Sequence, residues 1–212
     1  MNNYVGAGVA ILFTVGFVNF FNFMDGINGL AACQGIWGAL ALGVLLLWGG
    51  AENSPVVAAA MAGGCLGFLP HNFPRARMFM GDVGSTSIGF CLAMLTLVGG
   101  SRCPLPWTAF ILPLGVFIYD AVFTVVKRAI RRENIFRAHR EHHYQLLIRS
   151  GWSHVRVTFL QAALMTLFCA GAALYSWGGD LLRLMVLATL AAVMAVYSVL
   201  VHRLFARHGK PA

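Results

Sequence analysis

Charged side chains are scarce in this sequence. Asp, Glu, Lys and Arg together make up 10% of the 212 residues, whereas hydrophobic residues make up 59%. A soluble domain carries about 25% charged residues, so this chain has too few polar groups to cover its own surface in water. The composition therefore excludes a soluble globular domain and predicts a protein embedded in a lipid bilayer.

Metal-binding patterns built on cysteine or paired histidine are also absent. The five cysteines form no CxxC pair and no Cys/His ligand spacing, and no HExxH motif occurs. Four of the five cysteines lie within apolar segments, where cysteine usually packs as a small hydrophobic side chain. The candidates for a catalytic or ligand-binding site are therefore side chains that offer oxygen or nitrogen atoms.

Long apolar runs are abundant. There are seven, roughly 4–21, 29–49, 55–71, 84–100, 106–127, 155–177 and 181–203. Each is close to the ~20 residues that a helix needs to cross a hydrocarbon core. Several are rich in Gly and Ala, which lets helices approach closely in a bilayer. We expect an all-α membrane protein, a polytopic bundle of about seven transmembrane helices, with residues 1–212 forming a single domain.

Positive charge gathers on one side of the predicted bundle. Thirteen of the fifteen Lys and Arg residues lie at 75–77, 127–156 and 203–210, and only Arg102 and Arg183 lie in alternate connections. With seven spans, the three basic regions share one membrane side, and the positive-inside rule makes that side cytoplasmic. The net charge of +8 is then a topology signal. We expect no nucleic-acid partner.

The first of three polar clusters on that side follows the first span. Its polar members are Asn19, Asn22, Asp25 and Asn28. They recur at every third position, which would place them along one helix face, and Gly26 would let a ligand approach the backbone there. The stripe could be a seam that bonds to neighbouring helices. Because each unpaired buried polar group costs about 1–3 kcal/mol, we favour a polar ligand beside it.

The second cluster joins the third and fourth spans. It contains Asn72 and the segment Phe79-Met-Gly-Asp82-Val-Gly-Ser85, just before an apolar run. This segment predicts a tight turn into a helix N-terminus that Ser85 or Asp82 could cap. The same N-terminus suits phosphate, and Asp82 offers the hard oxygen ligand that Mg²⁺ takes beside substrate phosphates. Phe79 is either a membrane anchor or a stacking platform for a nucleobase.

The third cluster extends over residues 127–145. A positive-inside clamp beneath a span explains the cations at 127–132. It explains the segment His139-Arg-Glu-His-His-Tyr-Gln145 poorly. Three histidines within five residues suit phosphate contacts or proton movement near neutral pH. A transition-metal site is the weaker alternative.

One acidic residue stands apart from the clusters. Asp120 lies inside the fifth apolar run, seven residues before Lys127. An ionisable side chain within a span is either functional or paired with an opposite charge. We expect Asp120 to pair with Lys127 or Arg128 and so to hold the loop of the third cluster in place.

Together the three clusters resemble the polyprenyl-phosphate N-acetylhexosamine-1-phosphate transferases, glycosyltransferase family 4. The matching segments are Asn22-Phe-Met-Asp25-Gly-Ile-Asn28-Gly-Leu-Ala31, Asn72-x-Pro-x-Ala-x-x-Phe79-Met-Gly-Asp82-x-Gly-Ser85 and His139-Arg-x-His-x-Tyr-Gln145. Three such motifs in order, each at a cytoplasmic loop, are specific, and the resemblance covers nearly the whole chain. The third motif is most similar to the O-antigen-initiating branch.

The resemblance implies Mg²⁺-dependent phosphoryl transfer, with Mn²⁺ as an alternative ion, at the cytoplasmic face of a bacterial inner membrane. Substrates would be a UDP-N-acetylhexosamine and undecaprenyl phosphate, and products a polyprenyl-diphospho-sugar and UMP, in cell-envelope polysaccharide synthesis. The family permits a homodimer. The implied metal ligands are Asp82, Asn22 and Asp25, and the implied catalytic residues are Asp25, Asp82 and His142. The implied nucleotide-binding residues are Gly26, Asn28, Asn72 and Phe79, and the implied phosphate or sugar contacts are His139 and Arg140.

One acidic element of the family has no counterpart here. Family members carry an Asp-Asp motif in an earlier cytoplasmic loop, and no Asp-Asp pair occurs in this sequence. The chain then corresponds to the C-terminal two-thirds of the family fold, and an inactive or split fragment is the alternative to an active transferase. A membrane transporter is a further alternative. It requires ionisable residues near mid-membrane on several helices, and only Asp120 qualifies.

Overall fold

Seven apolar helical segments dominate the structure, a computed structural model that describes residues 3–134, 137 and 139–209. No strand occurs within these ranges. The segments long and apolar enough to cross a membrane are Tyr4–Met24, Leu30–Trp48, Ser54–Asn72, Gly81–Arg102, Trp107–Ile130, His154–Trp177 and Asp180–His208. The predicted all-α polytopic bundle is confirmed.

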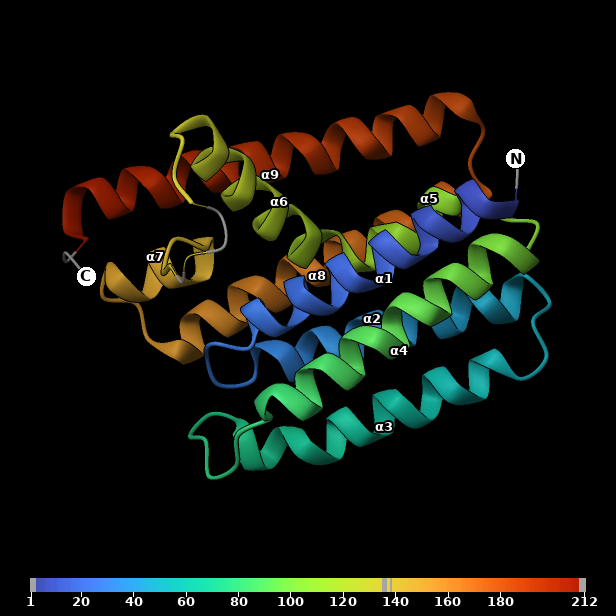
Figure 1. Cartoon of the computed structure of the whole chain (residues 1–212), viewed down its shortest axis with the longest axis horizontal. Coiled ribbons are helices and arrows are strands. Elements are labelled where there is room, and N and C mark those ends of the chain that lie inside the picture. The colour runs from blue at the N-terminus through green and yellow to red at the C-terminus, as the bar shows by residue number, and fades with distance from the viewer. Residues whose placement is uncertain (1–2, 135–136, 138, 210–212) are drawn as a thin grey trace.

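The elements follow one another through short connections (Figure 1). They are α1 (Asn3–Met24), α2 (Leu30–Trp48), α3 (Ser54–Asn72), α4 (Gly81–Arg102), α5 (Trp107–Ile111), the 3₁₀ turn η1 (Leu112–Leu114), α6 (Gly115–Ile130), α7 (His143–Arg149), α8 (His154–Trp177) and α9 (Asp180–His208). The fifth span is interrupted, because Pro113 lacks the N–H that a continuous α-helix would use. The short helix α7 was not predicted.

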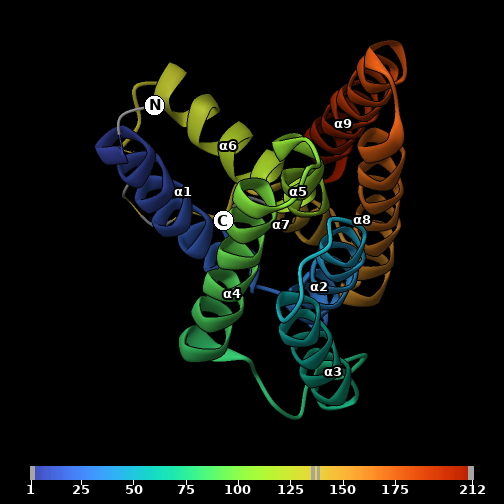
Figure 2. The ribbon, with the colours of Figure 1, turned by 90° about the vertical axis from the view of Figure 1, so that its right-hand side faces the viewer.

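Helix α2 lies at the centre of the bundle and packs against α3, α4 and α8. Helix α1 packs against α4 and α6, and α9 packs against α7 and α8. Figure 2 shows α1 with α6 on one flank and α8 with α9 on the other. In a bilayer, close packing rather than water exclusion holds such helices together. The large side chains Phe21, Leu46 and Phe117 accordingly lie fully buried between them.

All three polar clusters lie at one end of the bundle. The connections 25–29, 73–80 and 150–153, together with α7, lie at the left end of Figure 1, near the C-terminus. The connections 49–53, 103–106 and 178–179 lie at the opposite end. Side chains that are more than 100 residues apart in sequence can therefore contribute to one site.

Candidate active site

The first two clusters meet where α1 ends and α4 begins. The amide nitrogen of Asn22 donates hydrogen bonds to Asp82 Oδ1 (3.1 Å) and Ser85 Oγ (2.9 Å). Helix α1 ends at Met24, so Asp25 and Asn28 lie in the following connection and not on the helix. The predicted single stripe of four residues is therefore wrong, although three of its members still come together, because the turn folds back toward α4.

The predicted cap at the start of α4 is also absent. Helix α4 begins at Gly81, and no side-chain cap hydrogen bond forms at its N-terminus. Ser85 is already inside the helix, where its hydroxyl donates to the carbonyl of Gly81 (3.0 Å). Asp82 lies in the first turn with an exposed side chain. Its carboxylate is thus available to a ligand at the positive end of the helix dipole.

Asn72 ties the two connections together. Its side-chain oxygen accepts a hydrogen bond from the backbone N–H of Gly29 (2.6 Å), and its amide nitrogen donates to the carbonyl of Met78 (2.9 Å). Gly29 has a φ of 80°, a left-handed conformation that a residue with a side chain adopts at a cost. Asn28 also links the two connections, since its side-chain amide nitrogen donates to the carbonyl of Pro74 (3.1 Å).

These contacts enclose a cleft of about 260 Å³, which we call the Asp25–Asp82 cleft. Its lining includes Asn22, Asp25, Gly26, Asn28, Asn72, Phe79, Asp82 and His154. All seven residues predicted from the first two clusters as metal or nucleotide ligands therefore share one cavity. The side chain of Phe79 is 77% exposed at this cavity, so its ring is free to cover a flat ligand.

The cleft concentrates negative charge. Burial, with a further contribution from the negative charge of Asp82, raises the pKa of Asp25 from 3.8 to about 6. A cation between the carboxylates would relieve this repulsion. Among the described residues no group of three or more His, Cys, Asp or Glu could hold a metal ion. Two carboxylates and an amide suit Mg²⁺, which is bound by one or two carboxylates together with phosphate and water.

His154 is a cleft residue that the sequence patterns do not predict. It is the first residue of α8, and its Nδ1 accepts a hydrogen bond from the backbone N–H of Asn28 (3.4 Å). Thr158, one turn later, donates to the carbonyl of Asn28 (2.7 Å). The sequence offers little to single it out, because it is a lone histidine after Gly-Trp-Ser at the start of an apolar run.

The third cluster forms separate cavities. His139 and His142 line a groove of about 510 Å³ between α1 and α6, which we call the α1–α6 groove. Its other lining residues are Gly16, Asn19, Phe20, Phe23, Ala121, Val125, Arg137 and Gln145. Arg140 and His139 also line a basic cavity of about 900 Å³ that reaches α9. Neither His139, Arg140 nor His142 lines the Asp25–Asp82 cleft.

Tyr144 connects the two cavities. Its hydroxyl donates to the carbonyl of Phe23 (2.9 Å), at the end of α1. Its ring lies so close to Gly26 that a β-carbon there would overlap the Tyr144 hydroxyl. The third cluster is thereby fixed against the turn that carries Asp25.

Asp120 has partners other than the predicted ones. Its Oδ1 accepts hydrogen bonds from the backbone N–H of His143 (3.0 Å) and from Nδ1 of His143 (3.1 Å). The predicted pairing with Lys127 or Arg128 is wrong. Lys127 lies seven residues along α6, about 10 Å from Asp120 at 1.5 Å per residue. The N-terminus of α7 lies nearer.

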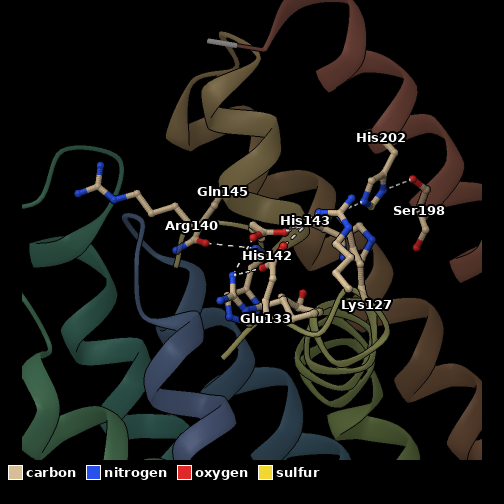
Figure 3. A network of polar contacts seen from close by, with 12 residues as sticks. Lys127, Glu133, Arg140, His142, His143, Gln145, Ser198 and His202 are labelled. Atoms are coloured by element: carbon tan, nitrogen blue, oxygen red, sulfur yellow. Dashed lines mark hydrogen bonds and ion pairs between the residues drawn. The ribbon is translucent and has the colours of Figure 1, made fainter. Parts of the chain in front are cut away.

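The two predicted cations have other partners. Arg128 pairs with Glu141 (2.8 Å) and Glu133 (3.0 Å). Nζ of Lys127 lies 3.0 Å from Nε2 of His202 on α9. Figure 3 shows Lys127 and His202 on one side of the His142–His143 segment and Arg140 on the other. These contacts hold the third cluster between α6 and α9.

Comparison with known proteins places this geometry in context. A family model described as Glycosyl transferase family 4 matches residues 1–100, which include the first two clusters. The phospho-N-acetylmuramoyl-pentapeptide-transferase of Heliobacterium modesticaldum is 38% identical over 167 residues, 76% of this chain and 49% of that protein. The decaprenyl-phosphate N-acetylglucosaminephosphotransferase of Mycobacterium tuberculosis is 34% identical over 173 residues, 72% of this chain and 43% of that protein.

A third relative comes from Bacillus subtilis. Its probable undecaprenyl-phosphate N-acetylglucosaminyl 1-phosphate transferase is 32% identical over 148 residues, 69% of this chain and 41% of that protein. The chain thus spans about half the length of the curated relatives it matches. None of the three names mentions O-antigen, so similarity to that branch stays a prediction. The family model and these relatives together show that the chain belongs to glycosyl transferase family 4.

Proposed function

We propose that the protein transfers N-acetylhexosamine-1-phosphate from a UDP-sugar to undecaprenyl phosphate, at the cytoplasmic face of a bacterial inner membrane. The observation that carries this proposal is the meeting of Asp25, Asp82 and Asn22 in a cleft at one end of a membrane bundle. The named relatives support it, because each is called a phosphotransferase, or a transferase of a phospho-sugar or 1-phosphate group.

The Asp25–Asp82 cleft is suited to a nucleotide diphosphate. Phe79 offers an exposed ring for the uracil base. Gly26, Asn28 and Asn72 form the wall that would face the nucleoside. In this proposal Asn72 acts by shaping the wall, because both of its amide atoms already bond to backbone groups.

Asp82, Asn22 and Asp25 would hold a Mg²⁺ ion, or Mn²⁺ in its place. The raised pKa of Asp25 supports a cation here, since two neighbouring carboxylates are more stable with a positive charge between them. When bound, Mg²⁺ would neutralise charge on the diphosphate. The protein's own contribution is to hold these oxygen atoms together at the end of the bundle where the polar clusters lie.

The α1–α6 groove is suited to the polyprenyl phosphate. Phe20, Phe23 and Val125 give it apolar walls for a hydrocarbon chain, while His139, His142 and Arg137 give it a polar end for a phosphate. His142 would contact that phosphate. His139 and Arg140 line other cavities than the Asp25–Asp82 cleft, so they would contact the diphosphate or the sugar only where the donor extends out of that cleft. The pKa of His139 is lowered, first by burial and then by the nearby charges of His142 and Arg128.

The reaction is a phosphoryl transfer. An oxygen of the lipid phosphate attacks the β-phosphorus of the UDP-sugar, a new P–O bond forms, and the bond to the α-phosphate oxygen breaks to release UMP. Positioning and charge neutralisation dominate such reactions. Tyr144 would keep the two cavities in register, because it joins the third cluster to the end of α1.

A transfer assay tests the proposal. Purified protein, undecaprenyl phosphate and Mg²⁺ are incubated with labelled UDP-N-acetylglucosamine or with labelled UDP-N-acetylmuramoyl-pentapeptide. We expect label to enter the lipid phase with one of the two donors. Asp82→Asn should lower the rate by at least about 100-fold, the size of effect seen when charge stabilisation of a transition state is removed.

Glu52→Gln is the matched control, because Glu52 lies in the connection at the opposite end of the bundle. It should leave the rate unchanged. The absence of labelled lipid with both donors, while the Bacillus subtilis relative gives product in parallel, would show that the proposal is wrong.

A further inference from the structure

Asp120 is at the centre of a buried network that the proposed reaction does not yet use. The residue is 1% exposed, within α6. Its Oδ1 receives hydrogen bonds from the backbone and ring of His143, and it lies 3.3 Å from Nδ1 of His142 and 3.4 Å from Thr124 Oγ1. An intramembrane acid held this closely by two imidazoles calls for an explanation beyond packing.

The two histidines have different surroundings. The ring of His143 is fully buried and packs against Phe123, Tyr197 and His202. His142 is 3% exposed, and it contributes to the wall of the α1–α6 groove. Of the two histidines, His142 is the one that lines the α1–α6 groove, whereas His143 contacts His202 of the basic cavity.

The contact with Asp120 determines which nitrogen of His142 is available. An ionised carboxylate only accepts hydrogen bonds, so a hydrogen bond across the 3.3 Å contact places a proton on Nδ1 of His142. The competing arrangement is an Nδ1 without a proton that accepts the backbone N–H of Gln145 as the cap of α7. Nε2 lies across the ring from this contact and is left for another partner. The backbone is fixed as well, because the N–H of His142 donates to Gln145 Oε1 (3.2 Å).

We infer that Asp120 is a positioning residue: it holds the Nδ1–H of His142 and so presents Nε2 to the phosphate at the polar end of the α1–α6 groove. The inference rests on the proposed function, which it deepens by naming the residue that orients His142. A carboxylate in this arrangement fixes the tautomer and stabilises the protonated ring, so that Nε2–H could donate to a phosphate oxygen.

A purely structural role is the competing explanation. Asp120 also accepts the backbone N–H of His143, the first residue of α7, and could serve only to anchor that helix. The two explanations predict different coupling between Asp120 and the two histidines. A positioning role requires His142, whereas an anchoring role does not.

Steady-state kinetics of single and double variants distinguish the positioning role of Asp120 from the anchoring role. Asp120→Asn should lower kcat by about 100-fold, the lower end of the loss when one charge-stabilising hydrogen-bond donor is removed, with little change in KM for the UDP-sugar. His142→Gln should cost about as much, and adding Asp120→Asn to it should cost nothing further. In a His143→Gln background the loss from Asp120→Asn should persist.

An additional loss in the His142→Gln background would overturn the inference. Thermal unfolding of each variant shows whether it is folded, and His142→Gln leaves the contact between Asp120 and the backbone of α7 in place. If Asp120→Asn does not fold, the inference is tested by the nitrogen measurement described next, which needs only the unmodified protein and His142→Gln.

A spectroscopic measurement tests the contact without relying on transfer activity. In protein labelled with ¹⁵N-histidine, the signals lost in His142→Gln identify His142, and their pattern shows which ring nitrogen carries the proton. We expect the neutral ring to be protonated at Nδ1. Protonation at Nε2 would overturn the inference, whereas absence of transfer by the unmodified protein would overturn only the proposed function.

Discussion

Asp25 carries an electrostatic cost in the folded protein. Its pKa rises to about 6 because the side chain is buried near the negative charge of Asp82. A carboxyl group whose pKa is higher in the folded than in the unfolded state binds its proton more tightly when folded. Folding stability should therefore fall as the pH rises from about 4 to about 6.

This pH dependence should disappear in Asp25→Asn. Thermal unfolding in detergent would show a melting temperature that decreases from about pH 4 to pH 6 in the unmodified protein. At neutral pH the variant should melt about 2–4 °C higher, which corresponds to ~1 kcal/mol once solvent screening of this part-exposed group is considered. A decrease of the same size in Asp25→Asn would assign the effect to another group.

Added Mg²⁺ should offset the loss of folding stability that ionised Asp25 causes beside Asp82. A ligand that binds only the folded state raises its stability. At neutral pH, millimolar Mg²⁺ should raise the melting temperature of the unmodified protein and of Glu52→Gln. It should not raise the melting temperature of Asp25→Asn or Asp82→Asn. Equal stabilisation of all four proteins would place the cation elsewhere.

At the scale of elements, the position of α7 depends on its contact with the turn after α1. Gly26→Ala would place a methyl group on the hydroxyl and ring of Tyr144. We expect a loss of about 1–3 kcal/mol in the free energy of unfolding, the usual cost of overpacking. Chemical denaturation in detergent would measure it.

Combining Gly26→Ala with Tyr144→Phe tests whether overlap with the Tyr144 hydroxyl causes this loss of stability. Tyr144→Phe alone should cost about 0.5–1.5 kcal/mol for each hydrogen bond lost, because the hydroxyl donates to the carbonyl of Phe23 and accepts from the side-chain amide of Gln145. Combined with Gly26→Ala it should cost less than the sum, because the hydroxyl is the atom closest to the new methyl group. Gly63→Ala, where a β-carbon meets nothing within 4 Å, is the control and should not destabilise the protein. If the double variant lost the full sum of the two free energies, overlap between the new methyl group and the Tyr144 hydroxyl would be contradicted.

The elements also show what the sequence could and could not predict. The seven spans follow from the length of each apolar run, and the cleft residues follow from polar groups that interrupt those runs at one membrane side. The break at Pro113 and the short helix α7 were missed, because hydropathy over a long window does not resolve single turns. His154 was missed because it reaches Asn28 across 126 residues, a contact that needs the packed helices.

The partner of Asp120 illustrates the same limit. The sequence predicts a neighbour of opposite charge, and Lys127 is the nearest along the chain. In the folded protein the N-terminus of α7 lies closer, so the histidines replace the cations. Distance along a helix was the wrong measure of proximity here.

At the scale of the whole molecule, the orientation in the membrane can be measured. The basic loops predict that residue 137 faces the cytoplasm and residue 52 the outside. In intact spheroplasts a membrane-impermeant maleimide should label Glu52→Cys, while Arg137→Cys should react only after permeabilisation. The native cysteines are buried or half-buried, so their background should be low. The reverse pattern would contradict the proposed location of the site.

The bundle brings two unlike cavities to one end. The Asp25–Asp82 cleft is small and acidic, whereas the α1–α6 groove is larger and mostly apolar with a polar end. This pairing suits one water-soluble and one lipid-soluble substrate. Tyr144 joins the two cavities, so a displacement of α7 should affect both substrates together.

Binding of UMP to the Asp25–Asp82 cleft tests the central claim most directly, because UMP is the product common to every UDP-sugar donor. Isothermal titration with Mg²⁺ present should give a saturable signal for the unmodified protein and for Glu52→Gln. We predict that affinity falls at least about tenfold in Asp82→Asn, a loss of ~1.4 kcal/mol or more. Equal affinity in Asp82→Asn, or no binding by the unmodified protein, would contradict the account.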